Sequence, residues 1–480
     1  MPLSQWLRTS LREQERKVLI LFLALSLVRG MIYSAVIPPW QAPDEPKHFE
    51  YIRLVYEKRR LITLQDQSES LQQEIIRSML DYDFPRLGHG RIDLSSLPQS
   101  FRGIWPVSPT MLLAPPLYFV VASLTQPFAS DAVASQLYIA RVVSVICGAL
   151  IVIFAFFTAR EIFPGDLFMV VGAPVFVIFL PMHTFIASTV INDNLANLLS
   201  ATAIYLMVCL IKKGLTLWRV VGLAIVIMLG VFTKRTALLT VPLAGVALLL
   251  SRHERMSMLL RRWWRWLLIV LISLTIVTAV ALFSKSIRVV LSRQIQIAYA
   301  TLMRYAFYSS SHLESILATL ADPRNWATLG LPAWMIFKSF WAYFGWMSVP
   351  LAPIWYQLLA VACLASSAGL IKCFFRSLSR SSVSDAWCRR ALLLLILSVI
   401  LVVVAAISFF SPWSSGPSQN LPQGRYLFPA LVPIAILFVL GLKEVMPDRY
   451  AQQGVLALTG TLITFDFVCF AGYIVPYFYY

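Results

Sequence analysis

The chain reads ASQLYIARVVSVICGALIVIFAFFT over residues 134–158, where Arg141 is the only charged side chain. An α-helix of about 20 apolar residues crosses the ~30 Å hydrocarbon core of a bilayer with its backbone hydrogen bonds made internally. This stretch therefore predicts a membrane-spanning helix, and similar apolar stretches recur along the whole chain. We expect eleven spans, which lie near residues 17–37, 134–158, 167–183, 187–210, 217–232, 237–251, 267–284, 350–371, 391–410, 427–442 and 453–475.

The composition of the 480 residues indicates the same class of protein. Hydrophobic residues make up 59% and charged residues only 13%, with a mean hydropathy of +0.74. A soluble protein of this length needs far more polar surface, so lipid must cover much of this one. The net charge of +17 raises the question of nucleic-acid binding, but the basic residues lie in short clusters between spans and not along one groove. We therefore exclude nucleic acid as a partner and expect an all-α polytopic membrane protein with a single domain over residues 1–480.

The basic clusters also predict how the spans are oriented. With eleven spans, every cluster falls on the same side as the N-terminus, and the excess of Lys and Arg in cytoplasmic loops places that side in the cytoplasm. Residues 111–127 are apolar too, but a further crossing there would turn every later cluster outward, so we expect a re-entrant or surface-lying helix. The sequence thus predicts a multi-pass protein of the plasma membrane, with a first outer loop over 39–133 and a second over 285–349.

The first outer loop carries two apolar stripes at helical spacing. The stripes consist of Phe49, Ile52, Val55 and Tyr56 and of Leu71, Ile75 and Met79. Glu50 falls on the opposite, polar side of the first stripe. Both patterns predict amphipathic helices that lie on the membrane surface.

A turn with acidic residues follows the first expected span. Residues 37–51 read IPPWQAPDEPKHFEY, and the prolines prevent the helix from continuing, so the backbone must turn at the membrane surface. Asp44, Glu45 and His48 stand on this turn. An acidic pair held there suits a general base for a hydroxyl acceptor, worth roughly 10²–10⁴-fold in rate. The alternative is that Asp44 or Glu45 merely caps the next helix, and the residues alone leave both readings open.

The segment PDEPKHF, residues 43–49, resembles the first outer loop of the GT-C superfamily of membrane glycosyltransferases. Four further resemblances follow in order, to the superfamily's second spanning helix, the helical hairpin after it, a short Thr-Lys turn and an Arg-Tyr-x-x-Pro helix start. They are carried by ARVVSVICGALIVIFAFFTAREIF (140–163), FLPMHTFIASTVINDNLANLLSA (179–201), FTKRTALL (232–239) and QGRYLFPALVPIAIL (423–437). The likeness covers about residues 30–440. It is greatest to a bacterial group of predicted membrane proteins of unassigned function, which share an SFWxxFGWM-like stretch, here Ser339–Met347. Protein O-mannosyltransferases and aminoarabinose transferases are more distantly similar.

This resemblance implies a GT-C-like bundle of about eleven transmembrane helices. It also implies a glycosyltransferase that moves a sugar, with inversion, from a polyprenyl-phosphate donor to an extracytoplasmic glycan, lipid or protein. Such transfer needs a base for the acceptor hydroxyl and cations for the departing lipid phosphate, which leaves readily without a strong acid. Asp44 would be the base, and Glu45 would assist or orient it. Asp193, at the outer start of its helix, would support the base, orient the sugar or cap the helix.

Five basic residues are candidates for the phosphate or for structural roles. Lys234, Arg235 and Arg425 fall at outer helix ends, where they would hold the lipid phosphate. Alternatively, Lys234 and Arg235 extend to lipid head groups. Arg29 and Arg141 lie inside spans, where a central charge costs about 2.5–3.5 kcal/mol and so usually has a partner or a function. We expect a structural role for both, with contact to a phosphate as the alternative for Arg141.

Three aromatic residues complete the candidate substrate contacts. Trp341 and Trp346 fall at the expected outer interface, where they form an ordinary aromatic belt or stack on a sugar ring. His48 lies beside the acidic pair, and some relatives in the superfamily use a divalent cation. One histidine beside two carboxylates matches no metal-ligand spacing, so we assign no metal and leave a divalent cation as an open alternative.

Two other classes of function remain open. A membrane transporter or lipid flippase usually shows internal repeats and polar sites near the midplane of broken helices. In this chain the polar candidates concentrate at one expected membrane face, which favours the enzyme. A polymerase or ligase of lipid-linked oligosaccharides uses the same leaving group with a longer donor, and the sequence does not separate it from single-sugar transfer.

Overall fold

The computed structural model describes residues 13–85, 97–104, 109–251, 326–379, 386–409 and 423–480. These residues are largely helical, with one antiparallel hairpin of two short strands, β1 (Tyr343–Phe344) and β2 (Val349–Pro350). Seven of the described helices are long and apolar enough to cross a membrane, which confirms an all-α polytopic membrane protein. They are α2 (Glu13–Val36), α6 (Val133–Ile162), α9 (Asp193–Lys213), α15 (Pro353–Ser379), α16 (Ala386–Phe409), α17 (Leu431–Val445) together with the 3₁₀ turn before it (Gly424–Ala430), and α18 (Ala451–Cys469), which runs on through a π-helical turn into α19 (Val475–Tyr479).

Three of the eleven expected spans differ from the structure within the described residues. The expected span 167–183 is a broken pair, α7 (Leu167–Ile178) and α8 (Pro181–Ala187), bent by 56° where Pro181 has no backbone N–H to continue the helix. Two other expected spans are α10 (Leu217–Val231) and α11 (Thr240–Leu250), with 15 and 11 residues. At 1.5 Å per residue each is shorter than the ~30 Å core. The expected span 267–284 lies outside the described residues.

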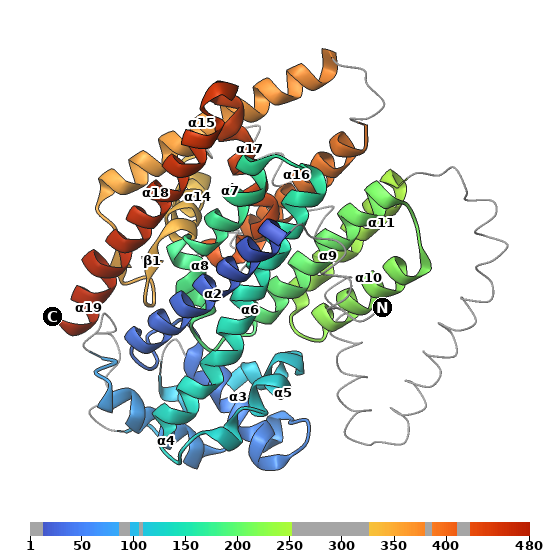
Figure 1. Ribbon diagram of the computed structural model, residues 1–480. Helices are drawn as coiled ribbons and strands as arrows, with labels where there is room; N and C mark the ends of the chain where they lie inside the picture. Colours follow the sequence, from blue (N-terminus) through green and yellow to red (C-terminus); the bar gives the residue numbers. More distant parts are fainter. Residues whose placement is uncertain (1–12, 86–96, 105–108, 252–325, 380–385, 410–422) are drawn as a thin grey trace.

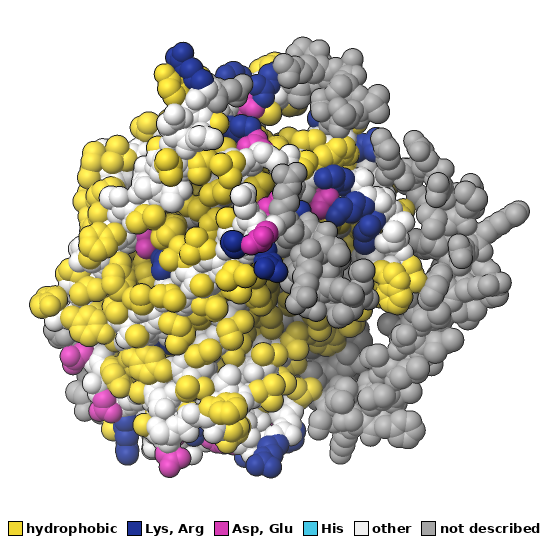
Figure 2. Space-filling model, in the orientation of Figure 1, with side chains coloured by type: hydrophobic (Ala, Val, Ile, Leu, Met, Phe, Trp, Pro, Cys, Tyr) yellow, Lys and Arg dark blue, Asp and Glu magenta, His cyan; other side chains and the backbone are white. Residues whose placement is uncertain are grey.

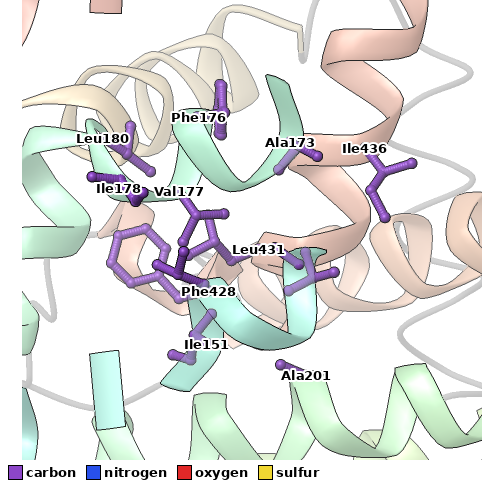
Figure 3. Packing of buried hydrophobic residues seen from close by; sticks show 14 of the residues in the cluster. Ile151, Ala173, Phe176, Val177, Ile178, Leu180, Ala201, Phe428, Leu431 and Ile436 are labelled. Carbon is purple, nitrogen blue, oxygen red and sulfur yellow. The ribbon is translucent and has the colours of Figure 1, made fainter. Parts of the chain in front are cut away.

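The centre of the bundle is a close-packed hydrophobic core. Side chains from α6, α7, α9 and α17 meet there, among them Ile151, Phe176, Ala201 and Leu431 (Figure 3). Where α17 meets α15, a Cβ at Gly441 would collide with the backbone of α15, so glycine lets these two helices approach closely. In lipid the hydrophobic effect does not drive helices together, so small residues that allow close backbone packing stabilise helix pairs. Figure 2 shows hydrophobic side chains over much of one face, with charged side chains near its upper and lower edges and in groups near the middle of the view.

A second, smaller layer covers one end of the bundle, at the bottom of Figure 1. It contains α3 (Glu45–Lys58), α4 (Glu69–Asp81) and α5 (Leu117–Ser123).

 Helix α14 spans Trp326–Trp341. Short 3₁₀ segments lie between the described α-helices, at Leu64–Asp66, Phe101–Gly103, Pro109–Leu113, Gln126–Phe128, Arg235–Leu239, Gly424–Ala430 and Asp448–Tyr450.

The two apolar stripes predicted in residues 49–56 and 71–79 face protein, except at Tyr56, which is exposed. Phe49 and Ile52 of α3 pack with Ile75 and Met79 of α4 in a separate buried cluster, and all four are fully buried. Glu50, expected on the exposed side, is also fully buried. The stripes therefore predicted the two helices correctly, but their apolar sides pack against protein and not on the membrane surface. Residues 111–127 contain only the seven-residue α5 and short 3₁₀ turns, too short for a crossing, and α5 packs on α3.

A buried ion pair joins the first and last of the spanning helices. Arg29 of α2 donates from Nε to Oδ2 of Asp466 in α18 at 3.0 Å, and the Tyr33 hydroxyl donates to Oδ1 of the same carboxylate at 2.7 Å. Arg29 also donates to the Thr184 hydroxyl at 2.8 Å. The structural role expected for Arg29 thus has a specific partner, which the sequence did not identify.

Removing one member of this pair is expected to destabilise the bundle. Arg29→Leu leaves the Asp466 carboxylate buried without its cation, a loss of about 3–5 kcal/mol, whereas Arg29→Leu with Asp466→Leu leaves no unpaired charge and costs less. Thermal unfolding in detergent, followed by tryptophan fluorescence, measures both. Lys17→Ala is the control, because its pair with Glu13 is exposed and contributes about 0–1 kcal/mol. A double variant no more stable than Arg29→Leu would contradict this account.

Candidate active site

The turn between α2 and α3 places Asp44 and Glu45 in different surroundings. Trp40 and Asp44 have φ angles of 73° and 68°, in the left-handed region, so the chain reverses sharply between the prolines of this segment. Asp44 precedes the first residue of α3, yet its side chain makes no capping hydrogen bond. The capping alternative for Asp44 therefore does not describe what its carboxylate contacts.

Glu45 and Arg141 form a fully buried ion pair behind the turn. Arg141 donates from Nε and Nη2 to the two Glu45 oxygens at 2.9 and 2.8 Å, and both residues have no exposed surface. The same carboxylate accepts hydrogen bonds from the backbone N–H groups of Trp40 and Val190, each at 3.0 Å. Glu45, expected to assist catalysis, and Arg141, a candidate phosphate contact, are thus both engaged in holding the turn, away from the pocket described next.

A cavity of about 390 Å³ opens beside this turn. It gathers six of the predicted site residues from four separate parts of the chain, namely Asp44, His48, Asp193, Lys234, Arg235 and Arg425. Met111, Ala114 and Pro115 form part of its wall, together with Ile191, Asn192 and Tyr426. Three basic side chains and two carboxylates therefore face one space, as a site for an anionic ligand requires.

Asp44 is held by cations at both of its oxygens. Oδ1 lies 2.6 Å from Nζ of Lys47, and Oδ2 accepts a hydrogen bond of 2.7 Å from Nη2 of Arg425. Burial alone would raise the pKa of Asp44, but Lys47 and Arg425 outweigh it and hold that pKa well below its usual range. The carboxylate is therefore ionised at neutral pH and is a weak base in this arrangement.

A second ion pair lies across the cavity. Lys234, in the turn between α10 and α11, contacts the Asp193 carboxylate at the start of α9. The Asn192 side chain donates to the Thr233 carbonyl at 3.3 Å, which fastens this turn to α9. Both carboxylates of the cavity are thus paired with cations, and Arg425 and Lys234 come from separate segments of the chain.

Arg425 has hydrogen-bonding capacity that the described residues leave unused. Its side chain is 3% exposed, and Nε and Nη1 are buried without a hydrogen-bond partner. Gly424 fixes the backbone next to it, because a Cβ there would collide with the backbone of Phe340, and its N–H donates to the Ser339 hydroxyl at 2.7 Å. The segment of residues 423–437, which contains Arg425, and the segment Ser339–Met347 therefore meet directly beside the cavity.

His48 is a neutral polar group in the cavity wall. Its ring stacks on Phe119 with centroids 5.6 Å apart, and Nδ1 is buried without a hydrogen-bond partner. Burial lowers the pKa of His48 to about 3, although the nearby Asp44 charge opposes this shift. At physiological pH the imidazole can donate or accept a hydrogen bond but adds no positive charge. No group of three or more His, Cys, Asp or Glu side chains among the described residues has the geometry of a metal site.

The two predicted tryptophans lie outside the cavity. Trp341 is 3% exposed and packs edge-on against Phe176 and Phe438 in the main core, so it is neither an interface belt residue nor a sugar platform. Trp346 donates from Nε1 to the Trp40 carbonyl at 2.9 Å and so supports the acidic turn. Sequence reasoning missed Tyr426 as a lining residue, although it directly follows Arg425 in a quoted motif.

Glu50, in α3 beyond the cavity residue His48, is a buried carboxyl group that pairs with no cation among the described residues. Oε1 accepts a hydrogen bond of 2.6 Å from Gln72 Nε2, whereas Oε2 has no partner among the described residues. Burial raises the pKa of Glu50 to about 7, and the Gln72 hydrogen bond only partly offsets that effect. The contact between α3 and α4 therefore contains a group that ionises near neutral pH.

We expect Glu50 to make stability fall as the pH rises. Its folded-state pKa of about 7 exceeds the ordinary value of 4.5, so ionisation favours the unfolded chain between these values, by on the order of 3 kcal/mol above pH 7. Glu50→Gln should remove this dependence, and its unfolding temperature should exceed that of the wild type at pH 8 more than at pH 5. Glu57→Gln, on the same helix but exposed, is the control. Equal pH dependence in wild type and Glu50→Gln would refute the assignment.

Comparison with known proteins places the chain in a family. Residues 27–435 match a family model described as "Predicted membrane protein (DUF2142)", a region that begins within α2, ends within α17 and includes every residue of the cavity. No curated protein matches the chain. Since the matched region covers most of the 480 residues, the protein belongs to the DUF2142 family of predicted membrane proteins.

Proposed function

We propose that the protein is a glycosyltransferase that moves a sugar from a polyprenyl-phosphate donor to an extracytoplasmic glycan, lipid or protein, with inversion. One observation carries this proposal. Asp44 and Arg425, 381 residues apart in sequence, meet in one cavity with Lys234 and Arg235. A carboxylate and several cations in one cavity are the groups that this reaction needs. The order and identity of the motifs, which resemble those of the GT-C superfamily, support the same reading.

The reaction assigns a task to each side of the cavity. Asp44 takes the proton of the acceptor hydroxyl as the acceptor oxygen bonds to the anomeric carbon of the sugar. The bond from that carbon to the phosphate oxygen breaks, and its electron pair leaves with the lipid phosphate. Arg425, Lys234 and Arg235 stabilise the charge that develops on the phosphate. Asp193 positions Lys234 through their ion pair, and His48 offers a neutral hydrogen bond to a sugar hydroxyl.

The distribution of charge favours an enzyme over a transporter or flippase. The charged lining of the cavity comes from the ends and turns of helices, next to the layer of α3, α4 and α5. In contrast, the Arg29–Asp466 pair within the bundle is buried and fully engaged. A transporter needs an accessible polar site near the midplane of broken helices. In the proposed arrangement the cavity faces the outer side of the plasma membrane, where polyprenyl-phosphate sugars are consumed.

Replacing Asp44 should abolish transfer without abolishing donor binding. Asp44→Asn removes the proton acceptor, so transfer should fall by roughly 10²–10⁴-fold. The measurement uses purified protein, radiolabelled monosaccharides linked to a short polyprenyl phosphate, and membrane-extracted lipids and glycans as acceptors. Glu57→Gln, a carboxylate of α3 outside the cavity, should transfer at the wild-type rate. Equal transfer by Asp44→Asn and wild type would move the base to Asp193, and no donor binding by either protein would favour a transporter.

Replacing Arg425 should weaken binding of the donor phosphate. A charge-assisted hydrogen bond contributes about 1.5–3 kcal/mol, so Arg425→Gln should raise the Kd for a polyprenyl-phosphate sugar by roughly 10–100-fold. Asp44 keeps its contact with Lys47 in this variant, which protects the turn. Arg376→Gln is the control, because Arg376 pairs with Glu444 and does not line the cavity. The same Kd for Arg425→Gln and wild type would exclude Arg425 from the phosphate site.

A further inference from the structure

The resting cavity holds its candidate base in an unreactive state. Lys47 and Arg425 occupy one oxygen of Asp44 each, at 2.6 and 2.7 Å. A general base works best when its pKa lies near the working pH, and two bound cations push a carboxylate far from that condition. Deprotonation of an acceptor by Asp44 therefore requires that at least one of these contacts be weakened first.

Arg425 has the means to bind a second anion. Only its Nη2 is used by Asp44, while Nε and Nη1 are buried and donate to no described acceptor. A guanidinium binds two oxygens of a phosphate through two neighbouring N–H groups, either Nε with Nη2 or Nη1 with Nη2. Both arrangements include Nη2, which Asp44 occupies. A phosphate that binds Arg425 through two oxygens therefore gives one of the two buried donors a partner and displaces Asp44 from Nη2.

We propose that Asp44 and a phosphate group compete for Arg425, so that phosphate binding loosens the hold on Asp44 and makes it a stronger base. This inference rests on the proposed function, because the phosphate of the donor is the anion that enters the cavity. The site would therefore activate its base only after the donor has bound. Asp44 is then both the proton acceptor and the resting counter-ion of the phosphate site.

The competition must act equally in both directions. A phosphate beside Asp44 disfavours its ionised form, and by thermodynamic linkage the Asp44 charge weakens phosphate binding by the same factor. Removing the charge from residue 44 should therefore tighten phosphate binding. The backbone tolerates this change, because Asp44 is in the left-handed region, which asparagine adopts readily.

Binding of farnesyl phosphate to the full-length protein in detergent, measured by calorimetry, tests the inference without any transfer reaction. We expect Asp44→Asn to bind farnesyl phosphate about tenfold more tightly than wild type, within the usual range of coupling between sites. In an Arg425→Gln background the same substitution should change the Kd little. Asp166→Asn, which removes a carboxylate paired with Lys443 and outside the cavity, should leave the Kd unchanged. Farnesol, which lacks the phosphate, should show no difference between wild type and Asp44→Asn.

The outcomes separate this inference from the proposed function. Equal or weaker binding of farnesyl phosphate by Asp44→Asn overturns the competition, even if the wild type transfers sugar. The same tightening in the Arg425→Gln background also overturns it, because the effect would then not pass through Arg425. No binding by either wild type or Asp44→Asn overturns it as well. Asp44→Asn could also bind farnesyl phosphate more tightly, in a manner that depends on Arg425, while the wild type transfers no sugar. That result would support the competition and overturn the proposed glycosyltransferase function.

Discussion

Arg141 and Glu45 meet where neither side chain touches solvent, and the turn that carries the site is built around them. Removing two charges from water costs several kcal/mol per ion, so such a pair persists only when its remaining polar atoms are also satisfied. Here Arg141 donates to the carbonyls of Ser34, Ile37 and Pro38, and two backbone N–H groups donate to Glu45. These carbonyls lie at and just beyond the end of α2, where a helix leaves them without partners. One ion pair thus joins the end of α2, the start of α3, the first third of α6 and the turn before α9.

This arrangement gives adjacent carboxylates opposite roles. Because Glu45 points into the protein toward Arg141, the left-handed residue before it directs its own carboxylate to the cavity. The sequence shows Asp44 and Glu45 as an equivalent pair, and only the buried partner of Glu45 distinguishes them. The same reasoning explains Trp346, which supports the turn through the Trp40 carbonyl and does not contact the cavity.

Much of the fold and part of the site could be predicted from the sequence, for identifiable reasons. Lipid requires long apolar helices, so α2 and α6 follow from composition and length. The turn around Lys234 was predicted correctly, but hydropathy does not register helix breaks, and α10 and α11 were taken for full spans. Trp341 was misplaced because the same aromatic residue suits an interface and a core. The Arg29–Asp466 pair could not be predicted, since nothing in a single sequence shows which of its helices are neighbours.

The breaks in the helices are what make a charged cavity compatible with so apolar a chain. Backbone groups at a helix end need partners, and inside a membrane protein these come from other interrupted segments. Leu117 at the start of α5 donates to the Phe232 carbonyl at 3.0 Å, and Asn192 binds the next carbonyl, of Thr233. The turn before Lys234 is therefore held by two other helix starts, and its cation needs no insertion into lipid. Uninterrupted spans would have carried this charge along a lipid-facing helix, where it would have cost stability and faced no ligand.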